Sequence, residues 1–240
     1  LSVELAGRGH TVHVVCTSAP FHLDKPHPPG LHVHVASEAA PLSFMTPGPG
    51  LHALAAHLAH VCRTHKVDLV HAHYAVPHAA AAWMARDVLG AGAPPTVVTL
   101  HGTDVTRVGR DPVHGPLVRH AVRKAAAVTV PSRALGADAA AFLGEGAVPV
   151  DVVANFVDTE RLAPRQGGAR VALAGVLPGL AGNERVLFHV STFRPIKRTV
   201  DVVSIFARVA VAHPSRLVLV GDGPDRAVAE ARAHDLGVAD

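Results

Sequence analysis

Short apolar runs alternate along this chain with longer stretches in which apolar residues recur at helical spacing. Runs of strand length cover residues 11–17, 31–36, 67–73, 95–100, 127–132, 150–155, 185–191 and 216–223. Helical spacing covers residues 51–65, 76–90, 113–126, 133–143, 198–212 and 224–236. This repeated order of strand, helix and strand predicts an α/β fold of the doubly wound type, in which helices cover both faces of parallel sheets.

The alternation is interrupted at residues 159–184, where the strand pattern is lost and Gly and Pro accumulate. We therefore predict a first domain at residues 1–158, a linker region at 159–184 and the first part of a second domain at 185–240. The opening "LSVELAGRGH" has the pattern of a helix end closed by Gly9, and the chain stops directly after a helical stretch. We expect segments to be missing at both ends.

Composition narrows the function classes. With 240 residues, 49% of them hydrophobic, the chain can bury a large core, and charged residues or His interrupt every apolar run before membrane-spanning length. The net charge is only +3 and the cations form no long basic block, which disfavours nucleic-acid binding. Cys16 and Cys62 lack metal or redox spacing, so we predict a reducing, cytoplasmic location.

In doubly wound folds, ligands bind at the carboxyl ends of the strands, so the residues that follow each strand carry most information. The run at 185–191 is followed by Arg194, Lys197 and Arg198 at the start of a helix. Cations at a helix start favour a phosphate or diphosphate ligand, although a solvated helix start explains them as well. Gly221 and Gly223 follow the next strand and let the backbone approach a ligand closely.

Polar side chains also follow strands of the first domain. The segment "TLHGTD" groups His101, Thr103 and Asp104 around Gly102, and "HAHYAVPH" contains Tyr74, the single tyrosine of the chain. Asn155 follows the strand that precedes the linker region. Each has a structural explanation too, because His101 can cap a helix and Asn155 can fix a turn. The sequence indicates a polar cleft here without assigning its ligand.

Histidine pairs raise the question of a metal site. His71 and His73 share one face of a predicted strand, but no Cys, Asp or Glu nearby completes a ligand set. The chain has nineteen histidines, so pairs such as His32 and His34 are expected by chance. We predict no metal site.

The motifs "VHAHYAVPHA", "TLHGTD", "NFVD", "HVSTFRPIKR" and "LVGDGPD", in this order and spacing, resemble those of the family 4 retaining glycosyltransferases. The resemblance implies a GT-B fold, in which two Rossmann-like domains face a cleft, with the second domain incomplete here. Within the family, the chain is most similar to members that act in the first step of bacillithiol biosynthesis.

The resemblance implies transfer of N-acetylglucosamine from UDP-N-acetylglucosamine to the hydroxyl of L-malate, with retention of configuration and without a metal or other cofactor. The implied partners are these two small molecules, with no nucleic acid and no membrane span, and a homodimer is left open. By the same resemblance the catalytic residues are His101, Lys197 and Arg198. The implied donor diphosphate-binding residues are Arg194, Lys197, Arg198, Gly221 and Gly223. The implied acceptor-binding residues are Tyr74, Thr103, Asn155 and Arg198.

Three alternatives remain open. A family member with another acceptor, such as an inositol phosphate or a lipid-linked sugar, would keep the cations and differ at Tyr74 and Thr103. A noncatalytic, truncated ligand-binding remnant is another, because the family's Gly-rich loop should precede Leu1 and its paired glutamates should follow residue 240. A dinucleotide-binding protein is disfavoured, since no strand is followed by a G-x-G-x-x-G turn.

Overall fold

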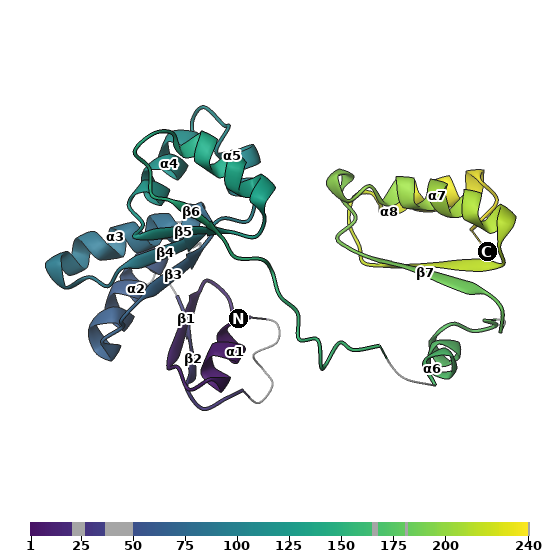
Figure 1. Cartoon of the computed structure of the whole chain (residues 1–240), viewed down its shortest axis with the longest axis horizontal. Coiled ribbons are helices and arrows are strands. Elements are labelled where there is room, and N and C mark those ends of the chain that lie inside the picture. Colours follow the sequence, from purple (N-terminus) through teal and green to yellow (C-terminus); the bar gives the residue numbers. More distant parts are fainter. Residues whose placement is uncertain (21–26, 37–49, 165–167, 181, 240) are drawn as a thin grey trace, which may run out of the picture. The chain divides into compact units, whose positions relative to one another are not determined.

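The computed structural model describes residues 1–20, 27–36, 50–164, 168–180 and 182–239. The chain divides into two compact units, Leu1–Val157 and Asp158–Asp240. Figure 1 shows α/β architecture in each unit. The boundary lies one residue before the end of the predicted first domain, and the predicted linker region contains a helix, α6 (Ala169–Val176).

All strands of the first unit pair in parallel, as predicted, but they form two sheets rather than one. A two-stranded sheet joins β1 (Val12–Cys16) to β2 (Leu31–Val35). The larger sheet has the order β3-β4-β5-β6 and consists of β3 (Val70–His73), β4 (Thr96–Thr99), β5 (Ala127–Val130) and β6 (Val150–Val152). Because the four strands of the larger sheet run parallel, their carboxyl ends line one edge of it.

The helices of the first unit follow the predicted pattern closely. They are α1 (Ser2–Gly7), α2 (Leu51–His65), α3 (Ala80–Leu89), α4 (Gly115–Arg123) and α5 (Arg133–Leu143). Helices α2 and α5 have the predicted bounds. The start of α5 is fixed by Ser132, whose side chain accepts a hydrogen bond from the N–H of Leu135 at 3.2 Å. Gly144 ends this helix with a φ of 75°.

The core of the first unit lies between the larger sheet and its helices. Its fully buried large side chains are Val98, Leu100, Val118, Val122, Val128, Val130 and Leu143. Alanines fill the tightest contacts of α3, where Ala80, Ala81, Ala82 and Ala85 are buried. Strands with β-branched residues covered on both faces are typical of parallel sheets.

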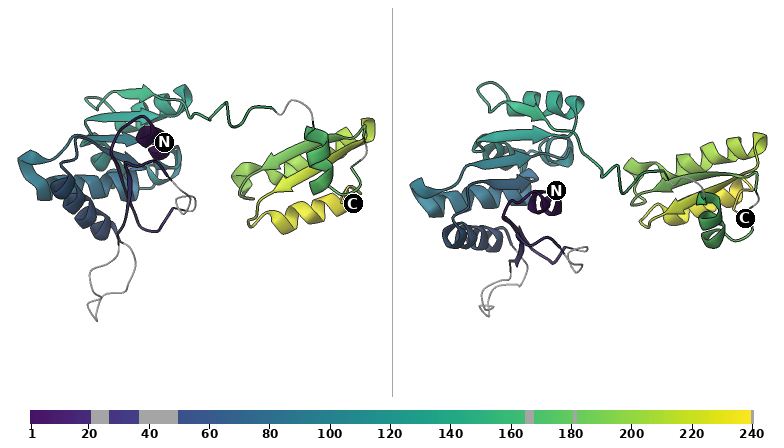
Figure 2. Two further views of the ribbon diagram at one scale, coloured as in Figure 1. Left: turned by 90° about the horizontal axis from the view of Figure 1, so that it is seen from below. Right: turned by 60° about the horizontal axis from the view of Figure 1, so that its bottom comes forward.

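The two-stranded sheet is attached to the rest of the unit by side-chain packing. Val15 of β1 and Ala36 beyond β2 contact a small cluster that includes Leu54 and Ala55 of α2. Figure 2 shows the purple pair β1–β2 beside α2 and apart from the larger sheet. Packing against α2 and α3, rather than backbone hydrogen bonding to the larger sheet, therefore positions β1 and β2.

The second unit contains one strand–helix–strand repeat. Its elements after α6 are β7 (Arg185–Val190), α7 (Thr199–Ala212), β8 (Ser215–Val220) and α8 (Arg226–Asp235). Figure 1 shows α7 and α8 on the same face of the sheet, whereas the sequence pattern predicts cover on both. Only one crossover, through α7, joins the two strands described, and Phe188 and Val190 of β7 are exposed.

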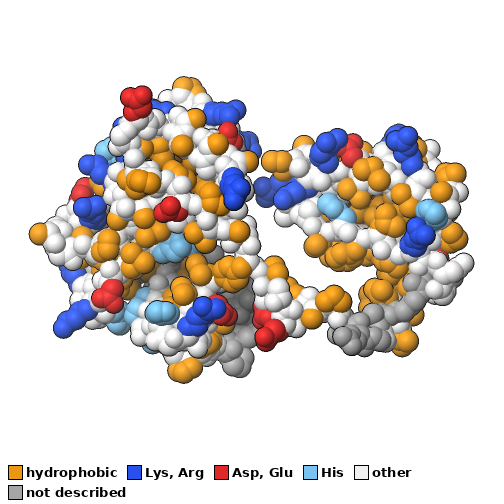
Figure 3. Space-filling model, in the orientation of Figure 1, with side chains coloured by type: hydrophobic (Ala, Val, Ile, Leu, Met, Phe, Trp, Pro, Cys, Tyr) orange, Lys and Arg blue, Asp and Glu red, His pale blue; other side chains and the backbone are white. Residues whose placement is uncertain are grey.

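No helix in the described part of the chain is long and apolar enough to cross a membrane. Figure 3 shows Lys and Arg side chains scattered over the visible face rather than gathered in one block.

Candidate active site at the strand ends

A buried carboxylate ties together the loops that follow β3 and β4. Asp104 is only 3% exposed, and it lies in the short helical turn Asp104–Val108. Its Oδ1 accepts a hydrogen bond from the N–H of Ala75 at 2.7 Å, and its Oδ2 accepts one from the N–H of His101 at 2.9 Å. Each loop is therefore fixed to the other through a single charged side chain. The sequence places Asp104 in the polar group but does not reveal this role.

His101 lies in a row of aromatic side chains at these strand ends. Its Nε2 is 3.0 Å from Nδ1 of His73, so one ring donates a hydrogen bond to the other. The Tyr74 ring lies 4.6 Å from the His101 ring, measured between centroids. The pKa of His73 is lowered to about 4, mainly by burial and in addition by the neighbouring imidazoles of His71 and His101. His73 is therefore neutral at pH 7 and can act as a fixed hydrogen-bonding partner for His101.

Tyr74 has an unusual backbone conformation, with a φ of 75°. Non-glycine residues rarely adopt positive φ, and such strain is concentrated at functional sites. The conformation is held by a hydrogen bond from the Tyr74 N–H to the carbonyl of Thr99 at 3.0 Å. The Tyr74 side chain is 42% exposed, so its face and hydroxyl are accessible to a ligand beside His101.

The predicted acceptor residues of the first unit are brought together only in part. Tyr74 contacts His101, and Thr103 is exposed on the same loop as His101. Asn155 lies in an exposed segment beyond the end of β6. The structure thus groups Tyr74, His101 and Thr103 at neighbouring strand ends, while Asn155 belongs to the segment that leaves the sheet.

The cations of the second unit follow β7 on an exposed turn. Pro195–Lys197 form a short 3-10 helix, and α7 begins directly afterwards at Thr199. Arg198 has a φ of 53° and its guanidinium pairs with Asp201. Within the described ranges, neither Arg194 nor Lys197 takes part in an ion pair. Two free cations beside the N–H groups of a helix start form a suitable place for a phosphate.

The backbone requires glycine at positions 221 and 223, for a reason that the sequence does not reveal. Their φ values are 141° and 152°, and a Cβ at either position would collide with the backbone carbonyl of Ser191 or Phe193. The loops after β7 and β8 are joined here, because the Phe193 N–H donates to the Asp222 carbonyl at 2.9 Å. These glycines thus allow one loop to pack on the other, and their contact with a diphosphate remains a prediction.

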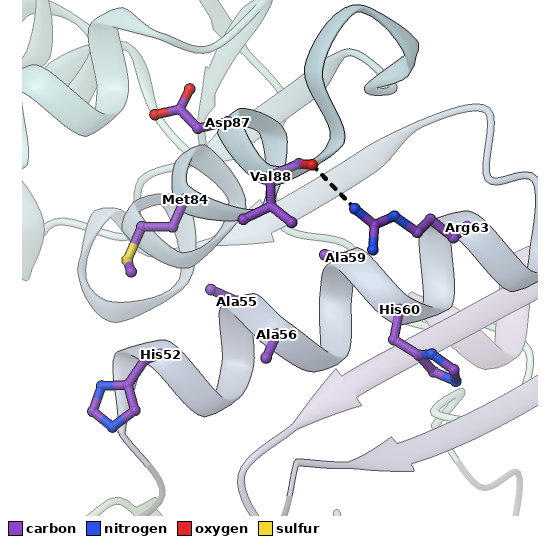
Figure 4. Close-up of a pocket in the computed structure, with 9 residues that line it drawn as sticks. All are labelled: His52, Ala55, Ala56, Ala59, His60, Arg63, Met84, Asp87 and Val88. Carbon is purple, nitrogen blue, oxygen red and sulfur yellow. Dashed lines mark hydrogen bonds between the residues drawn. The ribbon is translucent and has the colours of Figure 1, made fainter.

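A groove of roughly 540 Å³ lies elsewhere in the first unit, between α2 and α3. Figure 4 shows its alanine-rich floor on α2, with Arg63 donating a hydrogen bond to the carbonyl of Val88 at 3.1 Å. None of the predicted site residues lines this groove. The strand ends of each unit remain the candidate functional positions, with imidazoles and a buried carboxylate in the first unit and cations in the second.

Comparison with known proteins places these features in one family. Residues 1–161 match Glycosyltransferase Family 4. The chain is 34% identical over 225 residues to the N-acetyl-alpha-D-glucosaminyl L-malate synthase of Bacillus anthracis, a match that covers 94% of this chain. The chain spans 57% of the length of that relative.

Solved structures of glycosyltransferases share the fold. A glycosyltransferase from Rickettsia africae matches with a TM-score of 0.71 and 15% identity, covering 100% of this chain and 60% of that one. Sucrose-phosphate synthase from Thermosynechococcus elongatus matches with a TM-score of 0.69 and 18% identity, covering 100% and 61% of the two chains. These matches confirm the predicted GT-B type of fold, of which this chain forms a part.

Proposed function

This chain belongs to glycosyltransferase family 4, and we propose that its protein transfers N-acetylglucosamine from UDP-N-acetylglucosamine to the hydroxyl of L-malate. The observation that carries the proposal is the 34% identity to an N-acetyl-alpha-D-glucosaminyl L-malate synthase over 94% of this chain. The product would enter bacillithiol biosynthesis, and a cytoplasmic location stays a prediction. The strand-end residues support the chemistry as follows.

The turn after β7 suits the donor diphosphate. Cleavage of the bond between sugar and phosphate builds negative charge on the leaving UDP, and preorganised cations that meet this charge lower the barrier. Arg194 and Lys197 are exposed and lack an ion-pair partner among the described residues, so their charges are available to a ligand. Arg198 must exchange its contact with Asp201 for a substrate oxygen, which suits a residue that also contacts a malate carboxylate.

The strand ends of the first unit suit the reacting sugar and the acceptor. His101 is held by a backbone hydrogen bond to Asp104 and by the ring of His73, so its imidazole has a defined orientation. Tyr74 and Thr103 offer hydroxyl groups that can donate to a carboxylate, and Asn155 offers an amide. We assign no general base, because in retaining enzymes of this family type the leaving phosphate is the expected proton acceptor.

The proposal is tested with the complete gene product and UDP-N-acetylglucosamine in the presence of EDTA. L-malate, inositol phosphate and a no-acceptor control are offered in parallel, and products are identified by mass spectrometry. A conjugate of N-acetylglucosamine and malate is expected, with EDTA making no difference. Release of UDP without that conjugate, or a conjugate formed only with inositol phosphate, would contradict the malate assignment and leave the family assignment intact.

A further inference from the structure

Three histidines distant in sequence converge at the edge of the first unit, away from the strand-end residues described above. They are His13 of β1, His34 of β2 and His65, the last residue of α2. One ring nitrogen from each lies within 4.8 Å of the other two. Among the described residues, this is the group of His, Cys, Asp and Glu side chains with the spacing of a metal site. We infer that His13, His34 and His65 bind a divalent transition-metal ion, Zn²⁺ in the first instance.

The fold explains why these residues meet. In the parallel register, His13 is opposite His32 and Val15 is opposite His34, so these four side chains share the sheet face that packs on α2. Helix α2 ends at His65, and Lys66 turns the chain away with a φ of 50°. The helix end therefore brings a third imidazole over the face that already carries two.

One pair of ring nitrogens is already at a distance close to that of zinc coordination, and the third lies within 4.8 Å of both. Zinc binds His nitrogens at about 2.0–2.1 Å, which separates two nitrogens of a tetrahedral site by about 3.3 Å. Nδ1 of His13 and Nε2 of His34 are 2.9 Å apart, so this pair needs only a small opening. His65 is exposed at a helix end and can rotate toward them, and its exposure leaves an entry path and a fourth position for water.

The protonation state also suits a metal. Burial lowers the pKa values of His13 and His34, and the nearby imidazole of His65 lowers them further. Both rings are therefore neutral at pH 7, which is the form that coordinates a metal ion. Imidazole ligands without thiolates suit Zn²⁺ and its neighbours in the transition series rather than Mg²⁺ or Ca²⁺. The chain's own pairing of His13 with His34 is a weaker contact that the metal would replace.

The site would have a structural role. The sheet β1–β2 is attached to the rest of the unit through packing on α2, and a shared metal would add a direct link from both strands to the end of that helix. The site is independent of the proposed transfer reaction, for which no metal is required.

The test is equilibrium dialysis of the complete protein against Zn²⁺, with bound metal quantified, for wild type, His34→Gln, His65→Gln and His52→Gln. His52 is an exposed histidine at the other end of α2 and serves as the matched control. Wild type and His52→Gln should bind one Zn²⁺ with micromolar affinity, and His34→Gln and His65→Gln should lose at least tenfold. Zinc should also raise the unfolding midpoint of wild type by about 5 °C or more at 100-fold excess over its dissociation constant.

Because His65 is exposed, His65→Gln is expected to fold like wild type, which circular dichroism without metal verifies. Zinc affinity that persists in both ligand variants, an equal loss in His52→Gln, or wild-type binding weaker than millimolar would each overturn the inference.

Discussion

The strand ends of the two units differ in the environment of their charged residues. In the first unit, Asp104 is buried and both its oxygens accept backbone hydrogen bonds. In the second unit, Arg194 and Lys197 are exposed and free of ion pairs among the described residues. Similar positions after parallel strands thus carry a buried charge that holds two loops together in one unit and exposed charges, for which we propose a ligand, in the other.

The difference follows from desolvation. A buried carboxylate is tolerated only where hydrogen bonds replace water. Both oxygens of Asp104 are used in this way, so this side chain stabilises the fold. An exposed cation without an ion-pair partner among the described residues, such as Lys197, contributes little to the fold, so its removal is expected to leave stability unaffected. The comparison therefore predicts opposite responses to substitution at the two loops.

The largest effect is expected for Asp104→Ala. The substitution leaves the N–H groups of Ala75 and His101 without partners, at a cost of about 1–3 kcal/mol for each. The thermal unfolding midpoint should fall by about 5–20 °C, measured by calorimetry. Asp111→Ala is the matched control, because Asp111 also accepts two backbone hydrogen bonds but its side chain is 44% exposed, so water can replace it. Equal losses in the two variants would refute the role assigned to burial.

Lys197→Ala should show the reverse behaviour. Loss of one cation that stabilises the leaving diphosphate should lower kcat by about 100- to 1,000-fold, with the unfolding midpoint within a degree or two of wild type. Arg208→Ala removes an exposed cation from α7 of the same unit and should leave both quantities unchanged. Steady-state kinetics measures kcat, and calorimetry on the same preparations measures the unfolding midpoint. A parallel loss of activity and stability in Lys197→Ala would show that the lysine supports the fold.

A smaller effect is expected for His73→Gln, which tests whether His73 orients His101 in the first unit. His73 is a positioning residue, since it contacts His101 rather than a substrate. Loss of one neutral hydrogen bond should lower kcat by about 2- to 12-fold. His73→Asn, with a shorter amide, should do worse than His73→Gln if orientation of His101 is the cause. Equal rates in wild type and both variants would remove His73 from the site.

A pH effect follows from the same residue. The pKa of His73 is about 4 in the folded protein against an ordinary value of 6.5, so between these pH values the unfolded chain binds a proton that the folded protein does not. Stability should therefore decline as pH falls from 6.5 toward 4, and His73 contributes nothing above that window. In His73→Gln, denaturant titrations from pH 7 to 4 should give a shallower decline than in wild type. An unchanged slope would contradict the burial of His73.

Much of this fold can be predicted from the sequence because its signals are local. The periodicity of residues 51–65 and 133–143 defines α2 and α5 with their observed bounds, and the apolar runs locate the strands. The tendency of ligands to bind at the carboxyl ends of parallel strands likewise identifies His101 and the turn with Lys197 as candidate positions.

What the sequence does not reveal depends on contacts between distant residues. The separation into two sheets depends on which strands form backbone hydrogen bonds with each other. The role of Asp104 depends on the N–H of Ala75, which lies in another loop. Gly221 is needed because of a carbonyl in a neighbouring loop. His32 and His34 are explained as a chance pair by sequence alone, yet His34 meets His13 and His65 in space.

The central claim is that the exposed turn of the second unit binds the donor diphosphate while the fixed loops of the first unit do not. Calorimetric titration of UDP into wild type, Lys197→Ala and His73→Gln of the complete protein tests it most directly. The account predicts that Lys197→Ala weakens UDP binding by about tenfold or more, as expected for loss of a charged hydrogen bond, and that His73→Gln binds UDP like wild type. Unchanged affinity in Lys197→Ala, or the same loss in His73→Gln, would contradict it.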